Sequence, residues 1–280
     1  NASQPNSGVS GLAVGANVLR WTISNGTCAP STDELTITVQ ENPVNPYAGP
    51  DQTICATSST LAATPAAGGL WSVISGTGTL ANASLANSAV TGLSVGTNVF
   101  RWTIPGGACA SAFDEVSINV DAAPSAAIAG ADQTVCATTA TLAANTPGTG
   151  TGVWSVVSGT AVFSNASQPN SGVSGLAVGA NVLRWTISNG VCVSSFDDII
   201  ITREQSPVAD AGIDQRVCIG TNIVLQANSA NGGVWTLVSG SGVIQTPGQA
   251  NSSVQGLSAG VSVFKWTVPG NTCPASSDQV

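Results

Sequence analysis

The chain is built from one sequence pattern that recurs about every 82 residues. A signature of Arg-Trp-Thr or Lys-Trp-Thr returns at spacings of 81 to 83 residues, and a second tryptophan series and two cysteine series follow the same period. Self-similarity at a fixed period is typical of proteins made of consecutive copies of one structural unit. The tryptophans of the first series are Trp21, Trp102, Trp185 and Trp266, and those of the second are Trp71, Trp154 and Trp235.

Proline-containing stretches separate the copies, at Pro43, Pro124 and Pro207. Short proline-bearing linkers of this kind act as semi-rigid spacers. Segments 1–28 and 165–192 are identical at 27 of 28 positions, which indicates a recent duplication and predicts a longer parent array. The domains predicted from these boundaries are the C-terminal half of a repeat (1–42), two whole repeats (43–123 and 124–206) and a repeat lacking most of its last strand (207–280).

Each repeat has the pattern of short β-strands bounded by Gly, Ser, Asn and Pro, with no helical apolar period. Residues 98–104 place Phe100, Trp102 and Ile104 on one face, and residues 116–120 alternate in the same way. One apolar face per strand is typical of antiparallel sheets that are covered on one side. About seven strands per repeat fit an immunoglobulin-like sandwich. The predicted fold class is therefore all-β, as tandem immunoglobulin-like sandwiches.

Two regular disulfide pairings are open, within repeats or between neighbouring cysteines of consecutive repeats such as Cys109 and Cys136. In such a sandwich the first and last strands run the same way, and we place Cys55 near the start of the first strand. Cys109 and Cys136 would then lie about 30 Å apart, the length of the last strand, whereas a disulfide needs Cα atoms within about 7 Å. We therefore expect bridges within repeats and an oxidising compartment. The expected pairs are Cys55–Cys109, Cys136–Cys192 and Cys218–Cys273, with Cys28 left for a partner upstream of Asn1.

The composition excludes several functions. The net charge is −8 and only 7% of residues are charged, which argues against a nucleic-acid partner and against binding to anionic membranes, because both need clustered Lys and Arg. The chain has no His, which excludes Ser-His-Asp and Cys-His catalytic sites and His-ligated zinc. No apolar run is long enough for a transmembrane helix. The sequence thus predicts no direct membrane insertion, and its composition leaves open only catalysis by carboxylates alone.

Three aspartates stand four residues before the first cysteine of their repeats, near the predicted junctions. Carboxylate oxygens at a junction between domains are suitable ligands for Ca²⁺. The alternative is that each carboxylate accepts backbone N–H hydrogen bonds in its turn. The chain has no dense run of acidic residues, so we favour the alternative and expect no cofactor other than this calcium candidate. The aspartates are Asp51, Asp132 and Asp214.

Adjacent carboxylates open the last strand of the repeats. Paired carboxylates can hydrolyse glycosides, but neighbours on a strand point to opposite faces and cannot flank one bond. We therefore expect the outward carboxylate to pair with an arginine of the adjacent strand, Arg20, Arg101 or Arg184. The acidic pairs are Asp33/Glu34, Asp114/Glu115 and Asp197/Asp198.

The tryptophans are candidates for stacking on sugars. A carbohydrate site needs aromatic side chains on an exposed face, whereas these tryptophans share strand faces with Ile, Leu, Val and Phe. We therefore expect them to form the cores of the sandwiches.

Four motifs follow one another in the second repeat: AGPDQTIC (48–55), GLWS (69–72), VTGLSVGTNVFRWTI (90–104) and GGACASAFDEVSINV (106–120). This combination resembles the tandem PKD-like/Ig-like repeats of large cell-surface adhesins of Bacteroidota, which are associated with gliding motility and exported by type IX secretion. The resemblance covers the whole chain.

The resemblance implies an extracellular, cell-surface location and a non-enzymatic role, as a structural repeat region of an adhesin stalk or surface filament. The partners that it leaves open are other copies of the chain in a filament and extracellular polysaccharide. Two alternatives are kept. One is an array of polysaccharide-binding modules, and the other is an accessory array of a secreted polysaccharide-degrading enzyme.

Overall fold

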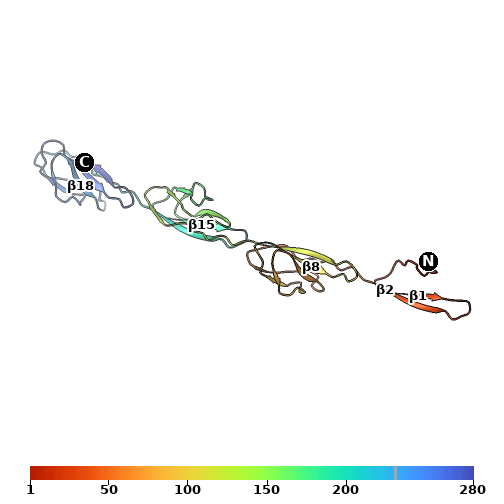
Figure 1. The fold of residues 1–280 in the computed structure, drawn as a ribbon. Helices are drawn as coiled ribbons and strands as arrows, with labels where there is room; N and C mark the ends of the chain where they lie inside the picture. The colour runs from red at the N-terminus through yellow and green to blue at the C-terminus, as the bar shows by residue number, and fades with distance from the viewer. Residues whose placement is uncertain (230–231) are drawn as a thin grey trace. The chain divides into compact units, whose positions relative to one another are not determined.

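The computed structural model describes residues 1–229 and 232–280, and every regular element in these ranges is a β-strand (Figure 1). The chain divides into two compact units. The first contains residues 1–123 together with 190–193, and the second contains 124–189 together with 194–280. A helix able to cross a lipid bilayer is not found within the described ranges.

The second repeat folds into two sheets, one of four strands in the order β3-β9-β8-β5 and one of three in the order β4-β7-β6. All neighbouring strands are antiparallel except the first and last, β3 and β9, which run parallel. This is the two-sheet arrangement of an immunoglobulin-like sandwich. The strands are β3 (Gln52–Ile54), β4 (Ser58–Thr60), β5 (Leu70–Ser75), β6 (Thr79–Leu80), β7 (Ala89–Thr91), β8 (Gly96–Ile104) and β9 (Ala112–Val120).

The third repeat has the same architecture, with sheet orders β10-β16-β15-β12 and β11-β14-β13. Its first and last strands are again parallel. Its strands are β10 (Gln133–Val135), β11 (Ala140–Thr141), β12 (Thr151–Ser158), β13 (Val162–Phe163), β14 (Gly172–Ser174), β15 (Gly179–Ser188) and β16 (Ser195–Arg203).

The fourth repeat forms two three-stranded sheets, β17-β20-β19 and β18-β21-β22. Its last strand, β22, has four residues, where β9 and β16 have nine each. Its strands are β17 (Ile223–Val224), β18 (Val234–Ser239), β19 (Val243–Ile244), β20 (Ser253–Gln255), β21 (Val263–Val268) and β22 (Ser276–Gln279). At the other end of the chain, β1 (Gly15–Ile23) and β2 (Ser31–Val39) form a two-stranded antiparallel sheet.

The predicted alternation in the sandwiches is confirmed. Phe100, Trp102 and Ile104 are buried, and the strand that pairs with β8 buries Val116 and Ile118 on the same side. The described residues form three clusters of buried side chains, drawn from 48–120, 129–201 and 211–268. The fold class predicted from the sequence, tandem all-β sandwiches, is therefore the fold of the protein.

A pair of tryptophans lies at the centre of each cluster. Their ring centroids are 5.2 Å apart in all three sandwiches, and the rings are tilted by 45–49°. A glycine lies against the second indole of each pair, and a Cβ atom added at Gly69 or Gly152 would lie 2.0–2.2 Å from ring atoms of Trp102 or Trp185. These glycines are therefore required by close packing rather than by an unusual backbone conformation. The pairs are Trp71–Trp102, Trp154–Trp185 and Trp235–Trp266.

Candidate functional site: disulfides between repeats

Two disulfides join consecutive repeats. Cys55 is bonded to Cys192 and Cys136 to Cys273; each bridge spans 137 residues and has a Cα–Cα distance of 5.0 Å. The predicted pairing within repeats is therefore wrong, and so is the alternative of neighbouring cysteines. Cys55, Cys136, Cys192 and Cys273 are bridged as expected but to other partners.

The position of Cys55 along its strand explains the correction. The first and last strands run the same way, as expected, but β3 is short and lies beside the end of β9, with Ile54 opposite Val120. Cys55 follows Ile54 directly, whereas Cys109 precedes the start of β9 at Ala112. The two cysteines thus lie at opposite ends of a nine-residue strand, about 30 Å long at 3.3 Å per residue. That distance excludes the bridge within the repeat, because a disulfide needs Cα atoms within about 7 Å.

The loop that carries Cys192 is held at the end of the preceding repeat's last strand. This loop joins β15 to β16, and its residues 190–193 belong to the first unit. The backbone N–H of Val191 donates a hydrogen bond of 2.9 Å to the Asp121 carboxylate, and the sulfur of Cys192 lies 3.5 Å from the carbonyl oxygen of Asp121. Asp121 directly follows β9 and thereby links the last strand of one repeat to the cysteine of the next.

The same contact recurs at the other two junctions. Glu204 Oε2 accepts a hydrogen bond of 2.8 Å from the N–H of Thr272, the residue before Cys273. Gln40 Oε1 accepts one of 2.6 Å from the N–H of Ala108, the residue before Cys109. In each case an acceptor side chain after the last strand holds the next repeat's cysteine loop. Sequence reasoning missed this role, although an acceptor side chain recurs here with the repeat period.

Glycine is required at one point of this contact. Gly190 has a φ of +51°, and a Cβ atom at this position would lie 1.8 Å from the Asp121 carboxylate. Only a residue without a side chain allows the loop to approach Asp121 this closely.

Three cysteines are unpaired, which corrects the expected bridges of Cys109 and Cys218. The sulfur of Cys109 lies 3.6 Å from the carbonyl oxygen of Gln40, close to the 3.5 Å and 3.7 Å found for Cys192 and Cys273 at their junctions. Cys109 therefore occupies the position of a bridged cysteine. The unpaired cysteines are Cys28, Cys109 and Cys218.

Two of the three aspartates considered for calcium accept hydrogen bonds from backbone N–H groups. Asp51 Oδ1 accepts a hydrogen bond of 2.8 Å from the N–H of Ser117, and Asp132 Oδ1 accepts one of 2.8 Å from the N–H of Ile200. Both donors belong to the last strand of the same repeat rather than to the local turn. The described residues contain no group of three or more His, Cys, Asp or Glu side chains suited to a metal ion. Calcium binding at Asp51, Asp132 and Asp214 stays a prediction.

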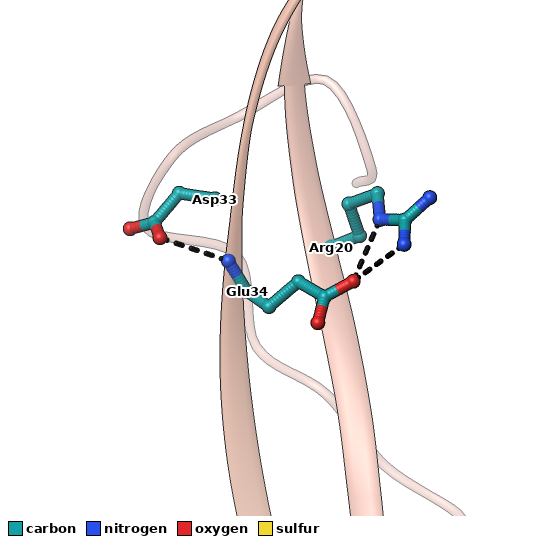
Figure 2. Close-up of polar contacts among 3 residues, drawn as sticks. All are labelled: Arg20, Asp33 and Glu34. Carbon is teal, nitrogen blue, oxygen red and sulfur yellow. Dashed lines mark hydrogen bonds and ion pairs between the residues drawn. The ribbon is translucent and has the colours of Figure 1, made fainter.

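The outward carboxylates form the expected ion pairs with arginines of the adjacent strand. Figure 2 shows Glu34 directed toward Arg20, with N–O distances of 2.6 and 2.8 Å, while Asp33 lies on the other side of its strand. The equivalent pairs are Arg101–Glu115 and Arg184–Asp198. The hydrogen bond from Arg184 lowers the pKa of Asp198 below its ordinary value, since it stabilises the charged carboxylate.

The inner carboxylates Asp114 and Asp197, and Asp278 at the equivalent position of the fourth repeat, have a different role. Asp114 Oδ2 accepts a hydrogen bond of 2.8 Å from the N–H of Ala48, and Asp197 and Asp278 make the same contact, also at 2.8 Å. The hydrogen bond from the backbone N–H of Ala211 lowers the pKa of Asp278, and that from the backbone N–H of Gln279 lowers it further. These carboxylates attach the chain that enters each sandwich to its last strand, and they do not face one another as a glycosidase pair would.

Six of the seven tryptophans are buried in the sandwich cores, as expected, and the exception is Trp21 in the β1–β2 sheet. The exposed aromatic side chains include Phe113 and Phe196, which sequence reasoning overlooked. Arg101 and Arg184 stack over these rings at 4.0 Å and 3.9 Å from their centroids. Both rings are thus already covered on one face by an arginine of their own repeat.

No protein-family model matches the chain, and no curated protein matches it in sequence. The I-band fragment I67–I69 from titin is similar in structure, with a TM-score of 0.49 and 12% identity over 85% of this chain and 97% of that one. A human CDH23 fragment, EC21–23, has a TM-score of 0.38 and 12% identity over 83% of this chain and 96% of that one. The fold assignment rests on the strand order and register described above.

Proposed function

We propose that the chain is a non-enzymatic structural region of an extracellular adhesin stalk or surface filament. The observation that carries this proposal is the pair of disulfides that joins consecutive sandwiches. Such bridges resist separation of neighbouring repeats, which is useful where a protein must hold its length outside the cell. They also require an oxidising compartment, which supports an extracellular location.

The resemblance to repeats of Bacteroidota surface adhesins agrees with this role. The buried tryptophans and the separated carboxylates support it further, because they leave neither an aromatic platform nor a paired acid site in the described sandwiches. We therefore place the polysaccharide-binding alternative second, with no specific observation in its favour.

We further propose that the repeats are separate folding units with the boundaries 43–123, 124–206 and 207–280, preceded by the half-repeat 1–42. The three clusters of buried residues lie wholly inside these three ranges. Limited proteolysis after reduction tests the boundaries, since the first cuts should fall near Pro43, Pro124 and Pro207.

The unpaired cysteines extend the pattern in this proposal. Cys109 lies at its junction as Cys192 and Cys273 do, so it should bridge to the cysteine that follows Asp-Gln in another repeat of this kind. Cys28 belongs to the same series as Cys109, and Cys218 to the series of Cys55 and Cys136. Peptide mapping of the natural protein without reduction should find all three in such bridges, and free thiols at these positions would contradict the extension.

Cell-surface labelling tests the function. Antibodies against residues 124–206 should bind intact, unpermeabilised cells, and deletion of whole repeats should reduce attachment without abolishing export. A glycan array provides the opposing outcome. Saturable binding of the isolated chain to a polysaccharide would replace the structural role by the binding-module alternative.

A further inference from the structure

The two disulfides overlap along the chain. Cys136 lies inside the segment that the Cys55–Cys192 bridge closes, and Cys192 lies inside the segment that the Cys136–Cys273 bridge closes. Bridges confined to single repeats would instead close three separate loops. The overlap therefore gives the chain a different covalent network from the one that the sequence predicted.

This network has two branch points, one at each disulfide. Three chain segments connect the first branch point to the second, namely 56–135, 137–191 and 193–272. A pulling force applied at the two ends of the chain enters at Cys55 and leaves at Cys273. Between these points it divides over three segments in parallel.

The shortest of the parallel segments limits how far the chain can be stretched. The shortest covalent route from Asn1 to Val280 passes from Cys55 to Cys192, back along the chain to Cys136, and across to Cys273. This route contains about 120 residues, which reach about 400 Å at ~3.4 Å per residue. The unbridged chain has 280 residues and reaches about 950 Å.

We propose that the overlapping disulfides make this region a redundant tether, whose length is nearly preserved when either bridge is lost. With one bridge gone, the other still shortens the route to about 145 residues, whichever bridge remains. The loss of one bridge thus adds about 25 residues, or roughly 80 Å, whereas the loss of both adds about 160 residues. Separate loops within repeats lack this property, because each broken bridge would release its whole loop.

Single-molecule force spectroscopy on the full 280-residue chain, held by its two ends, tests the proposal. The contour length is measured after all sandwiches have unfolded, so it depends on the bridges and not on the stability of a variant. The double variants Cys55→Ser/Cys192→Ser and Cys136→Ser/Cys273→Ser each remove one bridge. The matched control, Cys109→Ser/Cys218→Ser, removes two cysteines outside both bridges.

The expected lengths are about 120 residues for the oxidised chain and for the control, about 145 for each single-bridge variant, and 280 after reduction. Bridges within repeats would instead give about 225 residues for the control and for each of the other two variants, because in each case only one of three loops would remain closed. Either that result or a gain of about 50 residues or more for one lost bridge would overturn the proposal. The measurement uses the isolated chain, so its outcome is independent of the proposed adhesive role.

Discussion

Residues 1–28 and 165–192 have the same sequence at 27 of 28 positions but lie in different surroundings. Trp185 is 0% exposed at the centre of the third sandwich, whereas its counterpart Trp21 is 37% exposed. β15 lies in a four-stranded sheet, and its side chains pack against a second sheet, while β1 pairs only with β2. The same sequence therefore forms the same strand twice, and burial depends on what the rest of the chain brings against it.

The hydrogen bonds of a matched asparagine separate the local from the long-range part of this difference. Asn181 donates to the carbonyl groups of Ala177 and Gly179, and Asn17 makes the equivalent bonds in the first segment. Asn181 Oδ1 also accepts a hydrogen bond from the N–H of Thr160, in the turn that follows β12. Each asparagine also donates to the partner strand, Asn17 to the carbonyl of Ile37 and Asn181 to that of Ile201. The bonds within the segment and to the partner strand are thus shared, and the bond to a more distant element is specific to the complete sandwich.

The largest expected difference between the two segments concerns their cysteines. Cys192→Ser should remove a bridge that closes a loop of 137 residues, which costs about 5 kcal/mol in the chain-entropy account. Cys28→Ser should change the free energy of unfolding very little, because Cys28 is exposed and unpaired. Denaturation of the oxidised proteins in guanidinium, followed by tryptophan fluorescence, measures both. If Cys192→Ser lowered the free energy of unfolding no more than Cys28→Ser does, the bridge would not stabilise the folded chain.

The effects of replacing Trp185 and Trp21 on the free energy of unfolding should differ by a similar or somewhat smaller amount. Trp185→Ala should destabilise the third sandwich by about 3–5 kcal/mol, since it leaves a cavity in a packed core. Trp21→Ala should cost clearly less, because Trp21 is 37% exposed in a sheet of only two strands. Calorimetry that resolves the transitions of individual sandwiches is the measurement. A loss of several kcal/mol for Trp21→Ala would show that the β1–β2 sheet buries this ring in solution.

The glycines of the two cysteine loops provide a third, smaller comparison. Gly26 and Gly190 both have a positive φ, so alanine should cost about 1–2 kcal/mol at either site. A Cβ atom at Gly26 meets nothing within 4 Å, whereas one at Gly190 collides with Asp121. Gly190→Ala should therefore lose about 1–3 kcal/mol more, as the hydrogen bond from Val191 is broken.

Asp121→Ala tests the cause of that extra loss. In the Asp121→Ala background the two glycine variants should become nearly equal in their cost. A persistent difference would mean that Gly190 is required for another reason than its approach to the carboxylate.

The smallest expected effect is on the acid side of the stability profile. The pKa of Asp198 is lower in the folded protein than its ordinary value of 3.8, because Arg184 donates hydrogen bonds to it. This carboxylate therefore stabilises the fold above its ordinary pKa, and the stabilisation is lost as the pH falls through the lowered folded value.

Arg184→Gln should reduce the stability that the third sandwich loses as the pH falls. Arg20→Gln should leave the acid stability of the third sandwich unchanged, because β1 lies outside it. Unfolding midpoints between about pH 2.5 and 6 measure the effect, and NMR titration of Asp198 should show its pKa rising in Arg184→Gln. An unchanged pKa in that variant would contradict the assigned cause.

The strands and the tryptophan cores could be predicted from the sequence because both follow from local alternation. Phe100, Trp102 and Ile104 share a face whatever the rest of the fold does, since side chains alternate along any strand. The arginine–carboxylate pairs were predicted for the same reason, as they join facing positions of a single hairpin. The disulfides were not, because their pairing depends on where Cys55 lies along the neighbouring strand.

The end of the nine-residue strand β9 with which β3 pairs decides that question. The sequence shows that Cys55 follows a β-pattern, but not that β3 pairs with the end of β9 rather than its beginning. The contacts of Asp121 and Glu204 with the next repeat's cysteine loop were missed for a related reason. They join segments about 70 residues apart, and a single acidic residue after a strand carries no local signal of such a partner.

The order of the amino acids is sufficient to establish the repeat, the β-strands, the face of each strand that can be buried, and the absence of histidine-based chemistry. These properties depend on composition and on side-chain alternation, which are the same in any context. Long-range contacts, in contrast, set which of the two nearly identical segments is covered by a second sheet and which cysteines are bonded. Burial and disulfide pairing both depend on the position of residues that are distant in the chain, and the parallel register of the first and last strands places Cys55 at the end of β9, where it bonds to Cys192 rather than to Cys109.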